Sequence, residues 1–197
     1  VSNPTKAGYA FAGWTIKGMS DDCTHYYGDQ TTTLTELTGI RATNFKNLRA
    51  TNGTVTFTAV WNAETYSIQY NLNQGSSPNA PSFGLNHPET ALVGEGFTVN
   101  HPTMEGYNFI GWDITGMDSV THYYGTSSSS NTTTKVTSLE KTTATWFKDL
   151  RGEGGIVKFT ARWEPKQYDV TYGGNHYNSV TVASKGTFNQ NLPFSWT

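Results

Sequence analysis

Residues 106–114 read Gly-Tyr-Asn-Phe-Ile-Gly-Trp-Asp-Ile, and this stretch decides the fold. In an extended strand successive side chains point to opposite faces, so Tyr107 and Phe109 share one face. Trp112 and the isoleucine two residues after it have the opposite phase, and Gly111 lies where the phase changes. A β-bulge at this glycine turns all four large side chains toward one core. We therefore predict a bulged strand that forms the core.

The same stretch occurs twice in the chain. Residues 4–19 align with residues 102–117, and 10 of the 16 positions are identical. Residues 42–61 return as residues 144–163, with 12 of 20 positions identical. A period of about 100 residues is that of a small domain rather than of a solenoid unit. The repetition also serves as an internal control, because a chemical group present in one copy cannot carry a function common to both.

Alternating segments flank this strand in each copy. Tyr66–Tyr70 precedes it and is echoed by Tyr168–Tyr172, whereas Val157–Trp163 follows it and has Val55–Trp61 as its counterpart. Alternation of apolar and polar residues is typical of a half-buried strand, and one wet face is typical of an antiparallel sheet. The predicted structural core consists of the inward residues Tyr9, Phe11, Trp14, Phe57, Trp61, Tyr107, Phe109, Trp112, Phe159 and Trp163.

Two further segments separate these strands. Residues 144–151 carry apolar side chains three positions apart and end before Gly152, which predicts a short helix with a counterpart at residues 42–49. The excursion 117–136 contains the Ser/Thr tract 126–134, which we expect to be an exposed, mobile loop. The predicted fold class is mainly β (α+β), built from tandem small domains with one short helix per repeat.

The repeat boundaries can be placed in two registers. We favour residues 1–61 as the C-terminal part of a first repeat, 66–163 as a complete second repeat and 168–197 as the N-terminal part of a third, because charged and Pro-containing linkers follow the last Trp of each copy. The alternative register is 4–101 and 102–193. In the favoured register we expect flanking sequence or a neighbouring subunit to complete the units at each end by strand addition.

Composition excludes several classes of function. Charged residues make up 14% of the 197 residues, net charge is −2, and no Lys/Arg cluster could follow a phosphate backbone, so we expect no nucleic-acid partner. No apolar run approaches the roughly 20 residues of a membrane helix, so we expect no membrane insertion. The single cysteine, Cys23, cannot form an internal disulfide. Low charge with abundant Thr, Ser and Asn favours an extracellular, cell-surface location.

A recurring Thr-His-Tyr-Tyr-Gly motif is the strongest candidate for a ligand contact. His122 beside Tyr123 and Tyr124 could be a metal ligand, a sugar platform or a general base; alternatively the rings pack a loop and the histidine bonds a backbone carbonyl. Trp146 corresponds to Asn44 in the other copy, so its position is predicted to be exposed. These four residues are the predicted contact site.

Other chemistry is not supported by both copies. The Asp-Asp-Cys-Thr-His run that ends at His25 loses its Cys and one carboxylate in the second copy, so we predict no metal site and no cofactor. Neither a nucleophile with partners nor a paired carboxylate recurs, so we predict no catalytic residues and no enzyme. Lys158 is replaced by Thr56, so we predict no Lys–Asn isopeptide crosslink common to both copies.

Taken together, the motifs resemble the Listeria–Bacteroides repeat, the B-repeat type found in internalin B. That family has an opening Tyr-x-Val-x-Tyr/Phe strand, a Pro-Thr-x-x-Gly-Tyr-x-Phe-x-Gly-Trp core and a closing Ala-x-Trp strand, which match residues 66–70, 102–112 and 159–163. Residues 4–14 and 57–61 supply the last two elements again. The resemblance implies a β-grasp or ubiquitin-like fold in tandem repeats of bacterial surface proteins. This chain departs from the family by its longer 117–136 insertion.

The resemblance also implies a non-catalytic role. We expect a structural stalk repeat of a bacterial cell-surface or extracellular fibre protein, extended end to end by strand addition. The expected partners are neighbouring repeats or subunits of the same protein. The alternative is an adhesin module whose exposed aromatic residues bind a host or cell-wall glycan or protein.

Overall fold

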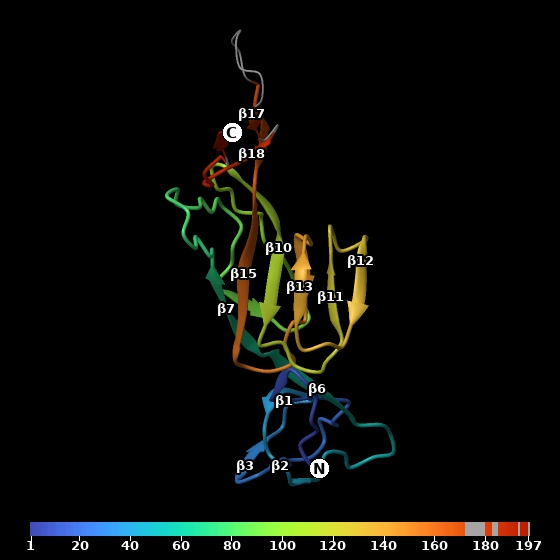
Figure 1. Cartoon of the computed structure of the whole chain (residues 1–197). Helices are drawn as coiled ribbons and strands as arrows, with labels where there is room; N and C mark the ends of the chain where they lie inside the picture. The colour runs from blue at the N-terminus through green and yellow to red at the C-terminus, as the bar shows by residue number, and fades with distance from the viewer. Residues whose placement is uncertain (172–179, 183–184, 193, 197) are drawn as a thin grey trace. The chain divides into compact units, whose positions relative to one another are not determined.

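The computed structural model describes residues 1–171, 180–182, 185–192 and 194–196, and within these residues the fold is mainly β and contains no helix (Figure 1). The strands are β1 Tyr9–Lys17, β2 His25–Tyr27, β3 Gln30–Thr32, β4 Glu36–Ile40, β5 Phe45–Lys46, β6 Thr56–Ala63, β7 Thr65–Asn71, β8 Thr90–Leu92, β9 Gly96–Thr98, β10 Tyr107–Thr115, β11 His122–Gly125, β12 Asn131–Thr134, β13 Leu139–Thr142, β14 Trp146–Lys148, β15 Ile156–Pro165, β16 Gln167–Asp169, β17 Val180–Val182, β18 Lys185–Thr187 and β19 Phe194–Trp196.

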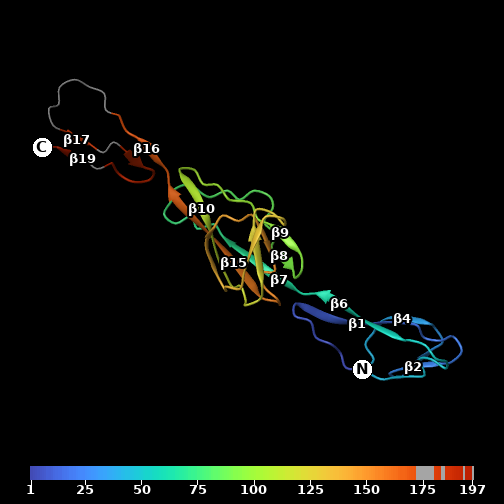
Figure 2. The same ribbon diagram turned by 90° about the vertical axis from the view of Figure 1, so that its right-hand side faces the viewer.

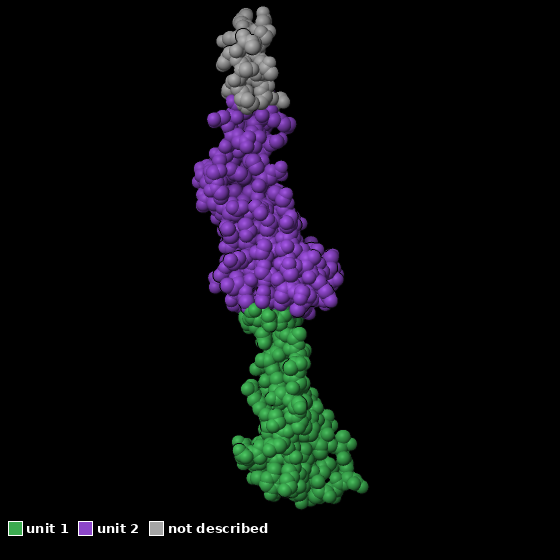
Figure 3. Space-filling model, turned by 60° about the horizontal axis from the view of Figure 1, so that its bottom comes forward, with its two compact units in different colours: residues 1–65, 92–94, 152–154 green, residues 66–91, 95–151, 155–197 purple. Residues whose placement is uncertain are grey.

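The chain forms two compact units, which Figure 3 shows in different colours. Unit 1 comprises Val1–Thr65, Leu92–Gly94 and Gly152–Gly154, and unit 2 comprises Tyr66–Ala91, Glu95–Arg151 and Gly155–Thr197. Of the residues predicted to belong to a third repeat, Tyr172 lies outside the described residues, as does residue 193, the end of the alternative register.

Unit 1 is built from two three-stranded sheets. Their strand orders are β4-β1-β6 and β3-β2-β5. Trp14, Ile16, Met19 and Leu37 form its buried cluster. The ring of Phe57 on β6 meets that of Trp14 edge-to-face, with centroids 5.9 Å apart. Apolar side chains from both sheets thus supply the hydrophobic burial that holds the unit together.

Unit 2 has larger sheets on the same plan. Its five-stranded sheet has the order β13-β10-β15-β7-β8, and its four-stranded sheet has the order β12-β11-β14-β9. The strands β10, β15 and β7 run side by side in both views (Figures 1 and 2). β15 is antiparallel to β10 but parallel to β7, so the sheet is mixed, although the one wet face of the closing strand is typical of an antiparallel sheet. The rings of Phe147 on β14 and Phe159 on β15 meet edge-to-face between the two sheets, with centroids 5.1 Å apart.

The predicted bulge is present in both copies. In unit 2 the register between β10 and β15 shifts between Phe109 and Gly111, and in unit 1 it shifts between Phe11 and Gly13. Gly111 has φ +135°, and a Cβ built there would lie 2.4 Å from the carbonyl carbon of Lys141. Only glycine combines this backbone conformation with so close an approach of β13.

The predicted core residues differ in their burial. Trp112 and Phe159 are fully buried, and Trp14 is 9% exposed. The remaining seven are half-buried: Tyr9, Phe11, Phe57, Trp61, Tyr107, Phe109 and Trp163. Among these, Tyr107 packs edge-to-face on Phe188 at 5.4 Å. The two fully buried residues of this set therefore lie in unit 2, on the Trp112 side of the bulge.

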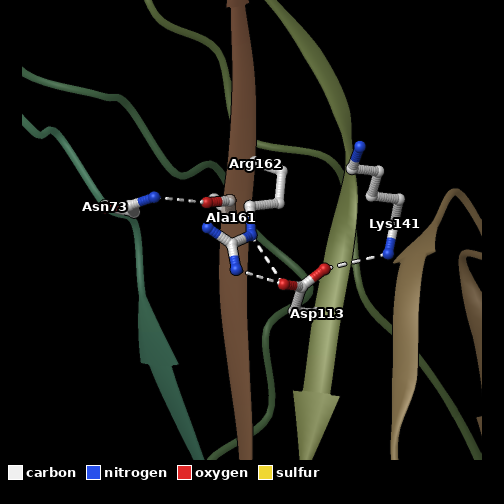
Figure 4. A network of polar contacts seen from close by, with 5 residues as sticks. All are labelled: Asn73, Asp113, Lys141, Ala161 and Arg162. Atoms are coloured by element: carbon white, nitrogen blue, oxygen red, sulfur yellow. Dashed lines mark hydrogen bonds and ion pairs between the residues drawn. The ribbon is translucent and has the colours of Figure 1, made fainter.

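A polar network fastens the bulged strand of unit 2 to its neighbours (Figure 4). The Nε of Arg162 on β15 donates to Oδ2 of Asp113 at 2.6 Å, and the backbone N–H of Lys141 on β13 donates to Oδ1 at 2.9 Å. Burial raises the pKa of Asp113, but the hydrogen bonds from Arg162 and Lys141, together with their positive charges, outweigh it and hold that pKa below its usual value.

This network makes the stability of unit 2 depend on pH. A carboxyl whose pKa is lower in the folded state stabilises the fold above its unfolded pKa of about 4, and the contribution is lost as the pH falls through the folded value. Asp113→Asn removes the charge that pairs with Arg162, so we expect it to lower the free energy of unfolding at pH 7. The loss should be no more than about 1 kcal/mol, because Arg162 is partly exposed and solvent screens the pair. Urea unfolding at a series of pH values should show the wild type and the variant converging below pH about 4. A difference that persists at low pH would contradict the assignment.

The predicted helix is wrong in both copies. Residues 146–148 form β14 and Phe45–Lys46 forms β5. Phe147 and Leu150 are buried, as their spacing suggested. Between them Asp149 has a left-handed backbone with φ +55°, which changes the face of the extended chain to which the next side chain points. Asn47 has the same φ in the first copy. With no helix in the described residues, the β-grasp fold implied by the resemblance is not supported.

The long Ser/Thr tract is only partly a loop. Residues 126–130 form the turn, but Asn131–Thr134 is strand β12, which pairs with β11 from His122↔Thr134 to Gly125↔Asn131. Thr fits a pleated surface well, and the Ser-rich turn returns the chain onto its neighbour. The prediction of a loop through residue 134 is therefore wrong.

Candidate functional site

The candidate contact site lies on the four-stranded sheet of unit 2. Tyr123 on β11 pairs with Lys148 on β14, and Gly125 pairs with Trp146. Directly paired residues share a face, and residues two apart on a strand share that face too. Tyr123, Lys148 and Trp146 therefore occupy one face of this sheet.

Close contacts fix the side chains on this face. The Nζ of Lys148 lies 5.6 Å from the centroid of the Tyr123 ring, within the range of a cation–π interaction. The Trp146 ring lies over Gly96 on β9, where a Cβ would come within 2.5 Å of the ring carbon Cζ2. Tyr123 and Trp146 are both half-buried, so each ring keeps an exposed part. Rigid, partly exposed rings of this kind can stack against apolar faces of a ligand.

The other two predicted contact residues lie on the opposite face. Tyr124 pairs with the buried Phe147. His122 is completely buried; its Nδ1 lies 2.6 Å from the backbone oxygen of Asp149 and its Nε2 lies 2.7 Å from that of Asp118. The structure thus places Tyr123 and Trp146 on one face of the sheet and Tyr124 and His122 on the other. This position of His122 agrees with the alternative interpretation of the motif, in which the histidine bonds a backbone carbonyl.

The position of His122 predicts a structural effect of its substitution. His122→Phe keeps a ring but removes the imidazole N–H that bonds a backbone carbonyl in a part-buried contact, so we expect the free energy of unfolding to fall by about 2 kcal/mol. His101 serves as the matched control, because its Nε2 bonds Thr143 O at 3.1 Å in an exposed setting and His101→Phe should cost less than about 0.5 kcal/mol. Urea unfolding checks both variants. Equal costs would contradict the structural role of His122.

Part of this surface recurs in unit 1 and was missed in the sequence. Tyr26 pairs with Lys46, whose Nζ lies 5.8 Å from the tyrosine ring. His25 is completely buried, and its Nδ1 lies 2.7 Å from the backbone oxygen of Asn47. The Nδ1 of His122 has the same kind of contact with the backbone oxygen of Asp149. Both tyrosine–lysine pairs lie in the duplicated segments, but only cross-strand register brings them together. The recurring surface feature is therefore a Tyr–Lys pair, to which Trp146 is added in one copy.

The environment of Cys23 is specific to unit 1. Its Sγ donates to Asn47 O at 3.2 Å and lies 3.7 Å from His25 Nδ1. Within the described residues no group of three or more His, Cys, Asp or Glu side chains could hold a metal ion. The thiol thus supplements the histidine–carbonyl contact that both units share.

A second aromatic group in unit 2 has no sequence motif. His87 stacks on Phe83 with ring centroids 4.3 Å apart, and both rings contact Tyr70. These three residues line an open hollow beside β7. Burial raises the pKa of the Tyr70 hydroxyl above its ordinary value, and that hydroxyl donates to Pro88 O at 2.9 Å. The three rings hold the segment between β7 and β8 against the sheet. No local sequence pattern predicts this group, because its members meet only when the chain is folded.

Among the described residues, no helix has the length and hydropathy that a membrane span requires. In comparisons with known proteins, no family model matches the chain, and no curated protein or solved structure is found to be similar to it.

Proposed function

We propose that the chain is a non-catalytic structural repeat of a bacterial surface or extracellular fibre protein, acting as a stalk. The observation that supports this most is what the two copies share. The bulged strand pairs with the closing strand in the same register in each, from Tyr9↔Ala63 in one and from Tyr107↔Pro165 in the other. The two copies thus share a strand scaffold. A spacer requires such a scaffold, because its role is to set a distance.

The surface of this scaffold fits an extracellular setting. Thr56 and Thr58 on β6 are exposed, as are Thr132 and Thr133 on β12. Uncharged hydroxyl side chains keep strand faces hydrated while their β-branched carbons favour the extended backbone. Antibodies against the chain should label intact, unpermeabilised cells of the source organism, and protease treatment of those cells should remove the label. Label found only after permeabilisation would refute the proposal.

A second function, an adhesin module, is favoured by one specific observation. Tyr123 and Trp146 share a face with Lys148, which pairs with Tyr123 and lies two residues from Trp146 on β14. Two ring faces beside a hydrogen-bond donor suit a saccharide, whose C–H surface stacks on rings while its hydroxyls accept from the ammonium group.

Substitution of Trp146 tests this alternative. We expect a glycan array to detect binding by the wild type and to lose it, by about tenfold or more in affinity, in Trp146→Ala. Tyr26→Ala is the matched control, since its face in unit 1 has Asn44 where unit 2 has the tryptophan, and binding should be retained. Binding that survives Trp146→Ala would refute this site.

A further inference from the structure

Two positively charged positions are the same in both copies of the repeat. When the copies are aligned, lysine meets lysine at Lys46 and Lys148, and arginine meets arginine at Arg49 and Arg151. The other lysines and arginines of each copy align with uncharged residues. Most surface charges have therefore been exchanged since the duplication, and the two retained positions require an explanation.

The retained arginine has a structural role in each unit. The Nη1 of Arg49 donates to the backbone oxygen of Gly18 at 2.7 Å, and the Nη1 of Arg151 donates to that of Gly116 at the same distance. Each guanidinium thus ties the residue after the bulged strand to the segment that follows β5 or β14. This internal bond explains why the arginine is the same in both copies.

The retained lysine has no such internal bond. Among the described residues, the ammonium groups of Lys46 and Lys148 neither form an ion pair nor donate a hydrogen bond. Each lies beside the ring of its paired tyrosine, with Nζ 5.8 Å from the centroid at Tyr26 and 5.6 Å at Tyr123. A cation–π contact at this range leaves the N–H donors of the ammonium group available to a ligand.

A threonine extends each Tyr–Lys pair into a row across three strands. Directly paired residues of neighbouring strands share one face, and in both units the threonine on the other side of the tyrosine is exposed. The two rows, which we call the Thr–Tyr–Lys rows, are Thr31–Tyr26–Lys46 and Thr133–Tyr123–Lys148. Each row therefore presents a hydroxyl group, a phenol ring and an ammonium group side by side.

We propose that each Thr–Tyr–Lys row binds a carboxylate-bearing sugar residue of an acidic polysaccharide. The ammonium group pairs with the carboxylate, the tyrosine ring packs against the C–H face of the sugar, and the threonine hydroxyl bonds a sugar hydroxyl. The unpaired charge favours an acidic sugar over a neutral one, and the ring favours a sugar over a bare anion. The inference goes beyond the stalk function, and it does not need Trp146, which has Asn44 as its counterpart in unit 1.

An NMR titration of the isotope-labelled chain tests the two rows separately. The probes are oligogalacturonate, alginate oligosaccharide and sialyllactose, each compared with its uncharged methyl ester. We expect at least one acidic probe to shift the backbone amides of both rows, on β2 and β5 in unit 1 and on β11 and β14 in unit 2. The shifts should weaken as salt rises from about 0.01 to about 0.2 M, because the rows are exposed. An absence of shifts at the rows with all three probes, or equal shifts with the esters, would overturn the proposal.

Substitutions that remove one charge assign the response to a row. Lys148→Met should weaken binding at the unit 2 row by about tenfold or more and leave the unit 1 row unchanged, and Lys46→Met should do the reverse. Lys158→Met is the matched control, because it removes an exposed lysine of unit 2 that has Thr56 as its counterpart. It should leave both rows unchanged. If it weakens binding as much as Lys148→Met does, the attraction is non-specific and the proposal is wrong.

Two further readouts separate these sites from other roles of the same residues. If the Tyr–Lys pair only holds the sheet together, Lys148→Met will lower the midpoint of urea unfolding and leave the ligand-induced shifts in place, which overturns the proposal. Trp146→Ala should leave the response of the unit 1 row unchanged, whereas glycans without a carboxylate report on Trp146 alone. Cell-surface labelling decides the stalk function on its own, so its failure and the failure of these sites are distinguishable.

Discussion

Phe159→Ala should lower the free energy of unfolding of unit 2 by about 4 kcal/mol. Phe159 is fully buried, and its ring meets those of Trp112 and Phe147 at centroid distances of 5.7 and 5.1 Å, so its removal opens a cavity where the two sheets join. Urea unfolding combined with hydrogen exchange of the β10 and β15 amides would measure the loss in this unit.

The duplicated chain offers its own control for this experiment. Phe57 is the counterpart of Phe159 and makes the same kind of contact with Trp14 and Phe45, but it is half-buried beside the open edge of β6. Less area returns to water when it is truncated, so Phe57→Ala should cost about 2 kcal/mol. If the two substitutions cost the same, the difference in core coverage between the units would be refuted.

Gly111→Ala should cost about 3 kcal/mol or more, although it adds a single methyl group. The residue has φ +135°, and the new Cβ would lie 2.4 Å from the carbonyl carbon and oxygen of Lys141. Backbone strain and a clash with backbone atoms then act together, because β13 cannot retreat without losing the bond from Lys141 N to Asp113. Thermal unfolding would measure the effect.

Two other glycines calibrate this prediction. Gly84→Ala should change stability by less than about 0.5 kcal/mol, since a Cβ there meets nothing within 4 Å. Gly13→Ala should reproduce the large loss in unit 1, where the new Cβ would lie 2.6 Å from the carbonyl carbon of Gly39. A mild effect at Gly111 would show that the bulge does not depend on glycine.

Local sequence pattern predicted the bulge but not the strand that replaced the helix. The phase change between Phe109 and Trp112 can be read within a few residues, because alternation is a property of any extended chain. A spacing of three from Ala144 to Leu150 is ambiguous, since a helix gives it and so does a short strand followed by a left-handed residue. Pairing of β14 with β9 and β11 selects the second, and those partners are distant in sequence.

The candidate site could likewise be predicted from the sequence only in part. The comparison of Trp146 with Asn44 predicted an exposed tryptophan, and in the structure this residue is half-buried. The motif that groups His122, Tyr123 and Tyr124 could not show that the second lies on the outer face and the others on the inner, because the face depends on which strand each residue meets. The Tyr–Lys pair recurs in both units and escaped notice for the same reason.

The sequence by itself determined the duplication, the mainly β class and the glycine-centred bulge, since each follows from short-range alternation and from comparing one copy with the other. Only the tertiary structure decided that β7 runs parallel to β15 and lies between β15 and β8. The physical reason is that a strand's backbone hydrogen bonds can be met by any neighbour of suitable pattern. The choice among neighbours is made by the core that the whole unit encloses.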